Sequence, residues 1–150
     1  MEKQKEQIDY LKLAEEIARK YHKGQKRLDG SDYITHLQGV VKLIREGMTG
    51  LKIVAWLHDI LEDTPMTKEK LLDFGFDKGL IKSVVILTRK EDEDYLDYVL
   101  RCYKDEIAIE VKIADLTNNL STIRKGSLKD KYRLTRFILM QKRGLNSSHA

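Results

Sequence analysis

Residues 54–64 read VAWLHDILEDT and combine the apolar spacing of a buried helix with four ionisable side chains. On a helix, residues three and four apart share a face, so His58 faces Glu62. For the same reason, Asp59 faces both Glu62 and Asp63. Charged groups are seldom buried unless they are paired or hold a metal ion. The segment therefore predicts a metal site, with extra carboxylates available for proton transfer.

The alternative for this segment is a helix end with solvated carboxylates. Glu62 and Asp63 come directly before a threonine and a proline, where a helix would stop. That alternative explains Glu62 and Asp63, but it does not explain His58 and Asp59, which are expected in mid-helix among apolar residues. The metal interpretation is therefore favoured.

The elements that must position these residues are expected to be helices. Apolar spacing predicts helices over residues 6–23, 33–46, 80–87, 95–103 and 128–143, and a frayed tail over 144–150. Thr67 stands at a capping position and predicts a further helix over 67–74. Residues 107–113 alternate as a strand would, but their spacing to the following leucines also suits a helix. A helix would place Asp115, Asn119 and Thr122 on one face at successive turns.

The composition indicates one highly charged globular domain, residues 1–150. Apolar residues make up 41% and charged residues 35%, and one proline with nine glycines suits helices joined by short loops. The net charge of +4 indicates an anionic partner. Basic residues are scattered and no nucleic-acid-binding signature is present, so a phosphorylated small molecule explains the charge as well as a nucleic acid does.

The location and broad reaction class are also constrained. The charged N-terminus is no signal peptide, and no apolar run approaches membrane-spanning length. Cys102 is the single cysteine, so an internal disulfide is excluded and a reducing cytoplasm is expected. Walker, GxGxxG, GxSxG and CxxC patterns are absent, which argues against ATP-driven, dinucleotide, serine-hydrolase and thiol-redox chemistry.

Three further residues have more than one interpretation from spacing alone. His22 ends the first helix and is interpreted as a partner-bonded histidine beside the core. His36 begins the apolar stripe of the second helix, where a lone histidine is more often structural than a ligand. Arg27 lies in a polar loop, where it could bind a phosphate, stack on a base or simply be solvated.

Four motifs in order, HKGQKR, YITH, LHDILEDT and KIADLTNNL, resemble those of the HD-type metal phosphohydrolases. The closest resemblance is to the RelA/SpoT-like alarmone hydrolases and their small single-domain relatives, over about residues 13–122. It implies a compact all-α bundle of about seven to eight helices. It also implies a metal held by four residues, His36, His58, Asp59 and Asp115. Because His36 is one of them, the resemblance replaces the structural interpretation of this histidine with a role as a ligand. Two imidazoles and two carboxylates suit manganese, iron or another hard divalent ion better than structural zinc.

The resemblance also assigns roles around the metal. Glu62 and Asp63 match the residues that orient and deprotonate the attacking water. Asn119 and Thr122 match positions that contact the nucleotide, and Arg27 matches a basic residue at its guanine end. The family commonly has a second cation after that arginine and another after the metal aspartate. Here leucines stand at both positions, Leu28 and Leu116.

The expected function is manganese-dependent removal of the 3′-pyrophosphate from the guanosine alarmones (p)ppGpp, in the cytoplasm. Because the chain ends soon after Tyr132, a hydrolase without a synthetase domain is expected. Two alternatives stay open. One is an HD nucleotidase or pyrophosphatase acting on other nucleotides. The other is a metal-bound nucleotide sensor or toxin-neutralising partner without turnover, against which Glu62 and Asp63 argue. The oligomeric state is left open.

Overall fold

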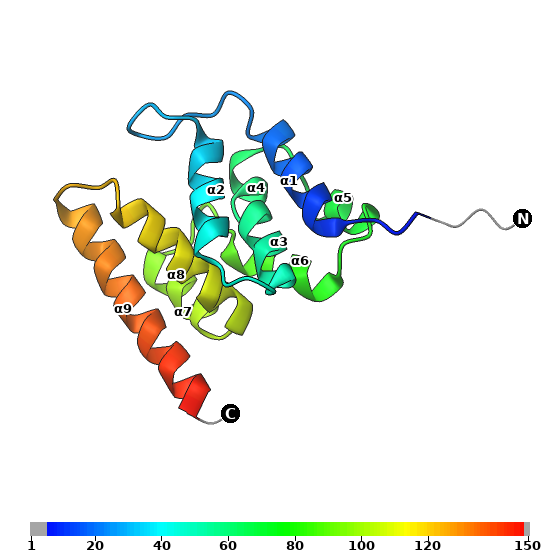
Figure 1. The fold of residues 1–150 in the computed structure, drawn as a ribbon. Coiled ribbons are helices and arrows are strands. Elements are labelled where there is room, and N and C mark those ends of the chain that lie inside the picture. The colour runs from blue at the N-terminus through cyan, green and yellow to red at the C-terminus, as the bar shows by residue number, and fades with distance from the viewer. Residues whose placement is uncertain (1–5, 149–150) are drawn as a thin grey trace, which may run out of the picture.

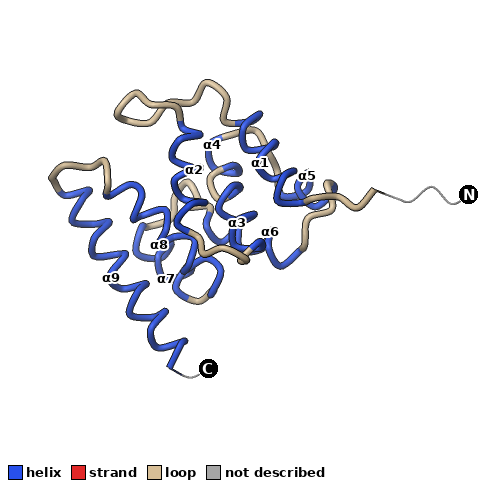
Figure 2. The backbone as a smooth tube through the Cα atoms, viewed as in Figure 1, coloured by secondary structure: helices blue, strands red, loops and turns tan. Residues whose placement is uncertain are grey.

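The structure, a computed structural model, describes residues 6–148. Within these residues it is all-helical, and its one β-type pairing is an isolated bridge between Lys26 and Asp32 (Figure 2). The helices are α1 (Tyr10–Tyr21), α2 (Tyr33–Leu43), α3 (Thr49–Leu57), α4 (Ile60–Asp63), α5 (Lys68–Asp73), α6 (Lys78–Leu87), α7 (Tyr95–Tyr103), α8 (Glu106–Leu120) and α9 (Ser127–Ser148). The all-α prediction is confirmed, and the described part of the chain has nine helices rather than seven to eight because α4 is a separate single turn.

Helix α3 is the centre of the bundle. It lies between α1 and α2 (Figure 1) and also packs against α6 and α8. The last five residues of this helix are all buried, because neighbours surround it on all sides: Ile53, Val54, Ala55, Trp56 and Leu57. A helix that is apolar on every face is stable only inside the core. The residues that directly follow it, His58 and Asp59, therefore also start from a buried position.

Helix α9 lies along the outer edge of the bundle (Figure 1) and packs mainly on α8. A second, smaller apolar cluster forms where these two helices meet, made of Ile109, Ile113, Leu116 and Leu139. The helix continues to Ser148, so the fraying expected from residue 144 is wrong up to that point, and residues 149–150 lie outside the described chain. No helix among residues 6–148 has the length and apolar character needed to span a bilayer.

The expectation that His58 and Asp59 lie in mid-helix is wrong. Helix α3 ends at Leu57, α4 begins at Ile60, and the two residues form the turn between them. The Nδ1–H of His58 donates to the carbonyl of Ala55 at 2.6 Å. The imidazole therefore hydrogen-bonds to the carbonyl that would accept from the Asp59 amide in a continuous helix. Such competition between a side chain and the backbone favours the end of a helix.

Other boundaries follow from helix caps. Asp9 accepts from the Lys12 amide at 3.0 Å, so the first helix begins at Tyr10 rather than at residue 6. Thr67 caps α5, as its position in the sequence predicts. The ambiguous residues 107–113 are helical, because Asp105 caps α8 by accepting from the Ala108 amide at 2.7 Å. The helical alternative for this stretch is confirmed.

Candidate metal centre and nucleotide pocket

The four predicted metal ligands converge from three separate segments. His36 comes from α2, His58 and Asp59 from the α3–α4 turn, and Asp115 from α8. One nitrogen or oxygen of each lies within 4.8 Å of the others. The Nε2 of His36 is 2.9 Å from Oδ1 of Asp115, and the Nε2 of His58 is 2.9 Å from Oδ2 of Asp59. The spacing suits coordination of one ion by all four side chains.

Both histidines are oriented by a hydrogen bond from Nδ1–H. His36 donates to Oδ1 of Asn118 at 2.7 Å, and His58 donates to the Ala55 carbonyl. Each Nε2 therefore faces the cluster, which is the arrangement of a metal-binding imidazole. The Nε2 of His58 is buried and has no hydrogen-bond partner among the described residues, although Asp59 lies close to it. A buried nitrogen without a partner is unfavourable, and a divalent ion would complete its coordination.

The cluster is electrostatically suited to a cation. Burial alone would raise the pKa of Asp59, but the neighbouring His58 outweighs it and holds that pKa at about 2. Burial likewise opposes ionisation of Asp115, but Lys112 Nζ lies 2.8 Å from its Oδ2 and helps to keep the pKa well below the usual range. Both carboxylates are therefore ionised in a largely buried site.

Tyr33 supports one of these ligands. Its hydroxyl donates to Oδ2 of Asp59. Burial and the nearby Asp59 charge raise the pKa of Tyr33 above its ordinary value, so the phenol keeps its proton and stays a donor. A donor to the ligand carboxylate fixes the orientation of that carboxylate.

Glu62 and Asp63 lie on α4, one turn beyond the ligands and outside the four-residue cluster. Glu62 Oε1 accepts from the Arg89 amide at 2.8 Å, and Asp63 Oδ2 accepts from Gln25 Nε2 at 3.1 Å. Partial burial and then the Asp59 charge raise the pKa of both carboxyl groups. A raised pKa makes a carboxylate a stronger base, so the pair is suited to taking a proton from water beside a metal.

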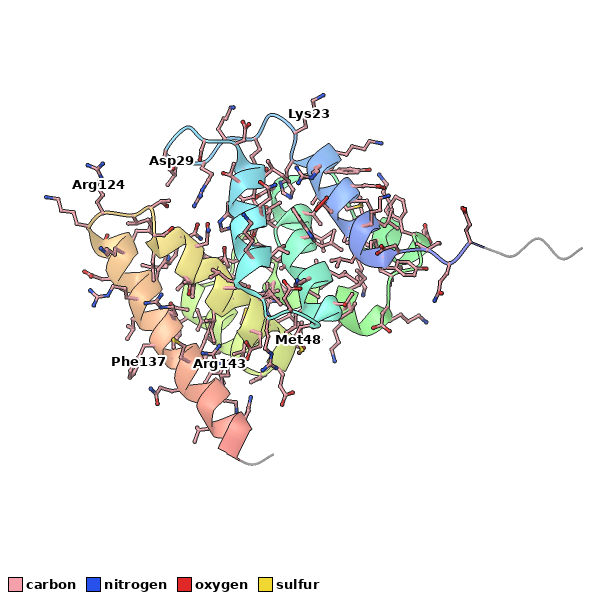
Figure 3. All side chains as sticks on the ribbon, in the orientation of Figure 1. Lys23, Asp29, Met48, Arg124, Phe137 and Arg143 are labelled. Atoms are coloured by element: carbon pink, nitrogen blue, oxygen red, sulfur yellow. The ribbon has the colours of Figure 1, made fainter. Side chains whose placement is uncertain are left out.

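Two of the three predicted nucleotide-binding residues, Arg27 and Thr122, lie where two loops meet. Figure 3 shows Asp29 of the α1–α2 loop and Arg124 of the α8–α9 loop at the same end of the molecule. The same two loops are in contact, because Arg27 Nη2 lies 3.4 Å from Oγ1 of Thr122. Asn119 is oriented differently, because its Nδ2 donates to Oδ1 of Asp115 at 3.2 Å. Arg27 and Thr122 are therefore together, whereas Asn119 supports the metal ligand.

The two leucines that depart from the family pattern have opposite environments. Leu28 is 98% exposed, so it contributes no packing beside Arg27. Leu116 is fully buried in the α8–α9 cluster and points away from solvent. Neither position supplies a cation to the nucleotide end of the site.

Sequence reasoning assigned no role to several residues that the structure places around the site. They share one property, a polar contact to a predicted ligand, base or nucleotide residue: Gln25, Tyr33, Arg89, Lys112 and Asn118. For Lys112 a signal was present, because it precedes Asp115 by three residues on a helix. Asn118 gave none, since its contact with His36 depends on how α2 meets α8.

Known proteins with similar sequences carry consistent names. The chain is 37% identical over 130 residues to a guanosine-3′,5′-bis(diphosphate) 3′-pyrophosphohydrolase of Haemophilus influenzae, covering 78% of this chain and 19% of that protein. It is 36% identical over 140 residues to the protein of the same name from Vibrio cholerae, covering 85% and 20%. It is 31% identical over 142 residues to the bifunctional (p)ppGpp synthase/hydrolase SpoT of Escherichia coli K12, again covering 85% and 20%. No family model matches the chain.

The chain is similar to SpoT-like proteins over most of its own length. This SpoT-like chain spans about a fifth of the length of the bacterial relatives it matches. Its fold matches a solved structure described as a metazoan ortholog of SpoT that hydrolyses ppGpp. That match has a TM-score of 0.71 at 20% identity and covers 91% of this chain and 86% of the other. The predicted resemblance to SpoT-like proteins and the all-helical HD-type fold are both confirmed.

Proposed function

We propose that the chain is a metal-dependent phosphohydrolase that removes the 3′-pyrophosphate from guanosine alarmones. The observation that carries the proposal is the cluster of His36, His58, Asp59 and Asp115 with two carboxylates one helical turn away. The names of the bacterial relatives support the substrate class. Manganese is the proposed ion, because the two imidazoles and two carboxylates suit a hard divalent cation.

The reaction is a displacement by water at the phosphorus attached to the ribose 3′ oxygen. Glu62 and Asp63 orient the water and take its proton while the new bond to phosphorus forms. The bond between phosphorus and the 3′ oxygen breaks, pyrophosphate departs, and the 3′ oxygen is protonated to a hydroxyl. A divalent ion held by the four ligands supplies Lewis acidity, which offsets the charge of the phosphate oxygens and acidifies water.

The nucleotide is held between the two loops. Arg27 offers a planar guanidinium, suited to a phosphate or to stacking on a base, and Thr122 lies beside it. Lys112 stabilises the ionised form of Asp115, and Tyr33 orients Asp59. These side chains prepare the site before substrate enters, which is the main contribution of a protein to phosphoryl transfer.

A wider nucleotide specificity is the second candidate, and the two leucines favour it. With Leu28 exposed and Leu116 buried, the nucleotide end has fewer cations than the family pattern provides. A pocket with fewer charge-assisted contacts discriminates less between nucleobases and phosphate arrangements. Under this alternative, the chain hydrolyses other phosphorylated nucleosides as well as alarmones do.

The deciding experiment is hydrolysis of a nucleotide panel by the purified chain. The panel contains ppGpp, pppGpp, their adenosine analogues, GTP, GDP and nucleoside 3′-phosphates, each tested with added manganese and after chelation. Release of pyrophosphate from ppGpp, abolished by chelator and restored by manganese, is the expected result. Hydrolysis of every panel member except the alarmones would contradict the substrate assignment, and turnover that survives full chelation would contradict the metal role.

A further inference from the structure

A buried histidine outside the ligand set is connected to one of the proposed bases. His22 ends α1 and is 2% exposed. Its Nδ1 lies 2.7 Å from Oε1 of Gln25, and Nε2 of the same glutamine lies 3.1 Å from Oδ2 of Asp63. Two hydrogen bonds in series therefore join the His22 ring to the Asp63 carboxylate.

The direction of both hydrogen bonds is fixed by chemistry. Asp63 is an acceptor when ionised, so the amide of Gln25 must turn its NH2 group toward it. The carbonyl oxygen of Gln25 then faces His22, and a carbonyl can only accept. The His22 ring must therefore carry its proton on Nδ1.

The packing around the other ring nitrogen, Nε2, does not explain why a histidine stands at this position. Nε2 of His22 is buried and has no hydrogen-bond partner among the described residues. The ring packs beside Tyr33, with centroids 5.2 Å apart. A buried polar atom without a partner is unfavourable, and an apolar side chain would fill this space without that penalty. The Nδ1–H contact to Gln25 is the feature of the histidine that a leucine could not replace.

The backbone around Gln25 holds this glutamine in place. The Tyr33 amide donates to the Gln25 carbonyl at 2.9 Å, and the adjoining residues Lys26 and Asp32 form the isolated bridge. The α1–α2 loop is thus closed at its base as a small hairpin. Such closure limits the backbone motion of Gln25, so the freedom that remains is mainly rotation of its side-chain amide.

The same hairpin base contacts two of the three acidic residues of the α3–α4 segment. Tyr33 donates to the ligand Asp59, and Gln25 donates to the proposed base Asp63 four residues later. Asp63 is otherwise accessible to solvent, where a free carboxylate samples several rotamers. A fixed donor on Oδ2 selects one orientation, and a displacement of about 1 Å in a reacting group can lower the rate by about a hundredfold.

We propose that His22 and Gln25 are positioning residues for Asp63: the Nδ1–H of His22 holds the Gln25 amide, and that amide holds the Asp63 carboxylate toward the attacking water. The inference rests on the proposed function, because it assigns Asp63 the role of a base. Neither residue touches the substrate in this account. Their effect on turnover passes entirely through Asp63.

Matched substitutions separate positioning from packing. Gln25→Met keeps the length of the side chain and removes its amide. Leucine and asparagine have the same branching and the same number of side-chain heavy atoms, but only His22→Asn places an N–H donor close to the original Nδ1 position. Gln141→Met, on the exposed surface of α9, is the control.

The expected result is a loss in kcat of about tenfold to a hundredfold for Gln25→Met and for His22→Leu, with KM within about twofold and full manganese content. His22→Asn should recover most of the kcat. The double variant of His22→Leu and Gln25→Met should be no slower than the single variants, because residues acting in series are not additive. Gln141→Met should match the wild type.

The inference is overturned if the two single losses multiply in the double variant, or if His22→Asn is as slow as His22→Leu. Ring-nitrogen NMR of the substrate-free protein adds a test that does not need turnover. His22 should carry its proton on Nδ1 in the wild type and should lose that preference in Gln25→Met. An active wild type with the proton on Nε2 overturns the positioning inference alone. A wild type that hydrolyses no nucleotide overturns the proposed function and, with it, the role in turnover.

Discussion

A Cβ atom at Gly39 would lie 2.2 Å from Nδ2 of Asn118. Glycine on α2 therefore leaves the space in which the Asn118 amide sits. From that place Asn118 Oδ1 accepts from His36 Nδ1 at 2.7 Å and lies 3.3 Å from Nη2 of Arg27. One amide thus connects a metal ligand with the arginine at the nucleotide end of the site.

Asn118→Ala should weaken manganese binding by about tenfold to a hundredfold, the usual effect of removing a partner of a ligand histidine. Calorimetric titration of the metal-free protein with manganese measures this directly. Gly39→Ala should act in the same direction, because the added methyl group displaces the amide. Gly144→Ala is the control, since its Cβ would meet no atom within 4 Å among the described residues beyond its chain neighbours and the nearby backbone of its own helix. Gly39→Ala with wild-type affinity would contradict the role of this amide.

His58→Ala should lose both bound metal and turnover, because it removes a buried ligand whose Nε2 faces the cluster. In the wild type, manganese at a hundredfold excess over its dissociation constant should raise the free energy of unfolding by about 2.7 kcal/mol. His58→Ala should gain nothing from added manganese. Elemental analysis and thermal unfolding with and without the ion check both statements, with Asp73→Asn on α5 as the control. Stoichiometric metal and full activity in His58→Ala would refute the ligand assignment.

Glu62→Gln should keep its metal and its substrate affinity while turnover falls by about two to four orders of magnitude, the usual contribution of a general base. The amide oxygen can still accept from the Arg89 backbone, so the adjoining loop should stay in place. Single-turnover kinetics and metal analysis measure the two properties separately, and Glu69→Gln in the first turn of α5 is the matched control. Loss of metal from Glu62→Gln would move this residue into the ligand set.

Leu28→Lys tests the departure from the family pattern. The side chain of Leu28 is 98% exposed, so a lysine fits without repacking, and Lys26 cannot easily substitute because it pairs with Asp32. If the missing cation limits selectivity, kcat/KM for guanosine alarmones should rise about tenfold relative to adenosine analogues. An unchanged ratio, with fold and metal content intact, would show that the exposed leucine has no effect on specificity.

Glu93 gives a pH-dependent prediction away from the metal. Arg101 binds its carboxylate at 2.6 and 3.1 Å and holds the pKa of Glu93 below its ordinary value. Because the folded-state pKa is the lower one, this pair stabilises the fold above the pKa of the unfolded chain, about 4.3. The contribution is lost as the pH falls through the folded-state pKa. Urea unfolding should therefore show Glu93→Gln less stable than the wild type at pH 7, with the difference shrinking below about pH 4. A difference that does not vary with pH would contradict this explanation.

The sequence was sufficient to predict the all-helical fold, the resemblance to SpoT-like proteins and the four side chains that converge in the candidate metal cluster, because these depend on apolar spacing and on motif order. The break at His58 was not predictable from periodicity. It depends on an imidazole bonding to the Ala55 carbonyl, a choice of rotamer that apolar spacing does not encode. The separate roles of Asn118 and Asn119 were equally hidden, because adjacent residues on a helix face different neighbours. Their partners follow from tertiary packing of α2 against α8.

The metal cluster gathers side chains from residues 36, 58, 59 and 115. An ion bound to all four would act as a cross-link, closing one loop from residue 36 to 58 and a second from 59 to 115. Closing chain segments of such length is entropically unfavourable, so the packed core must bring the ends together before the ligands can meet. Capture of an ion by the proposed ligands would consequently be a late event in folding. Once bound, the ion would oppose separation of the first half of the chain from α8, which no internal disulfide can do because Cys102 is the single cysteine.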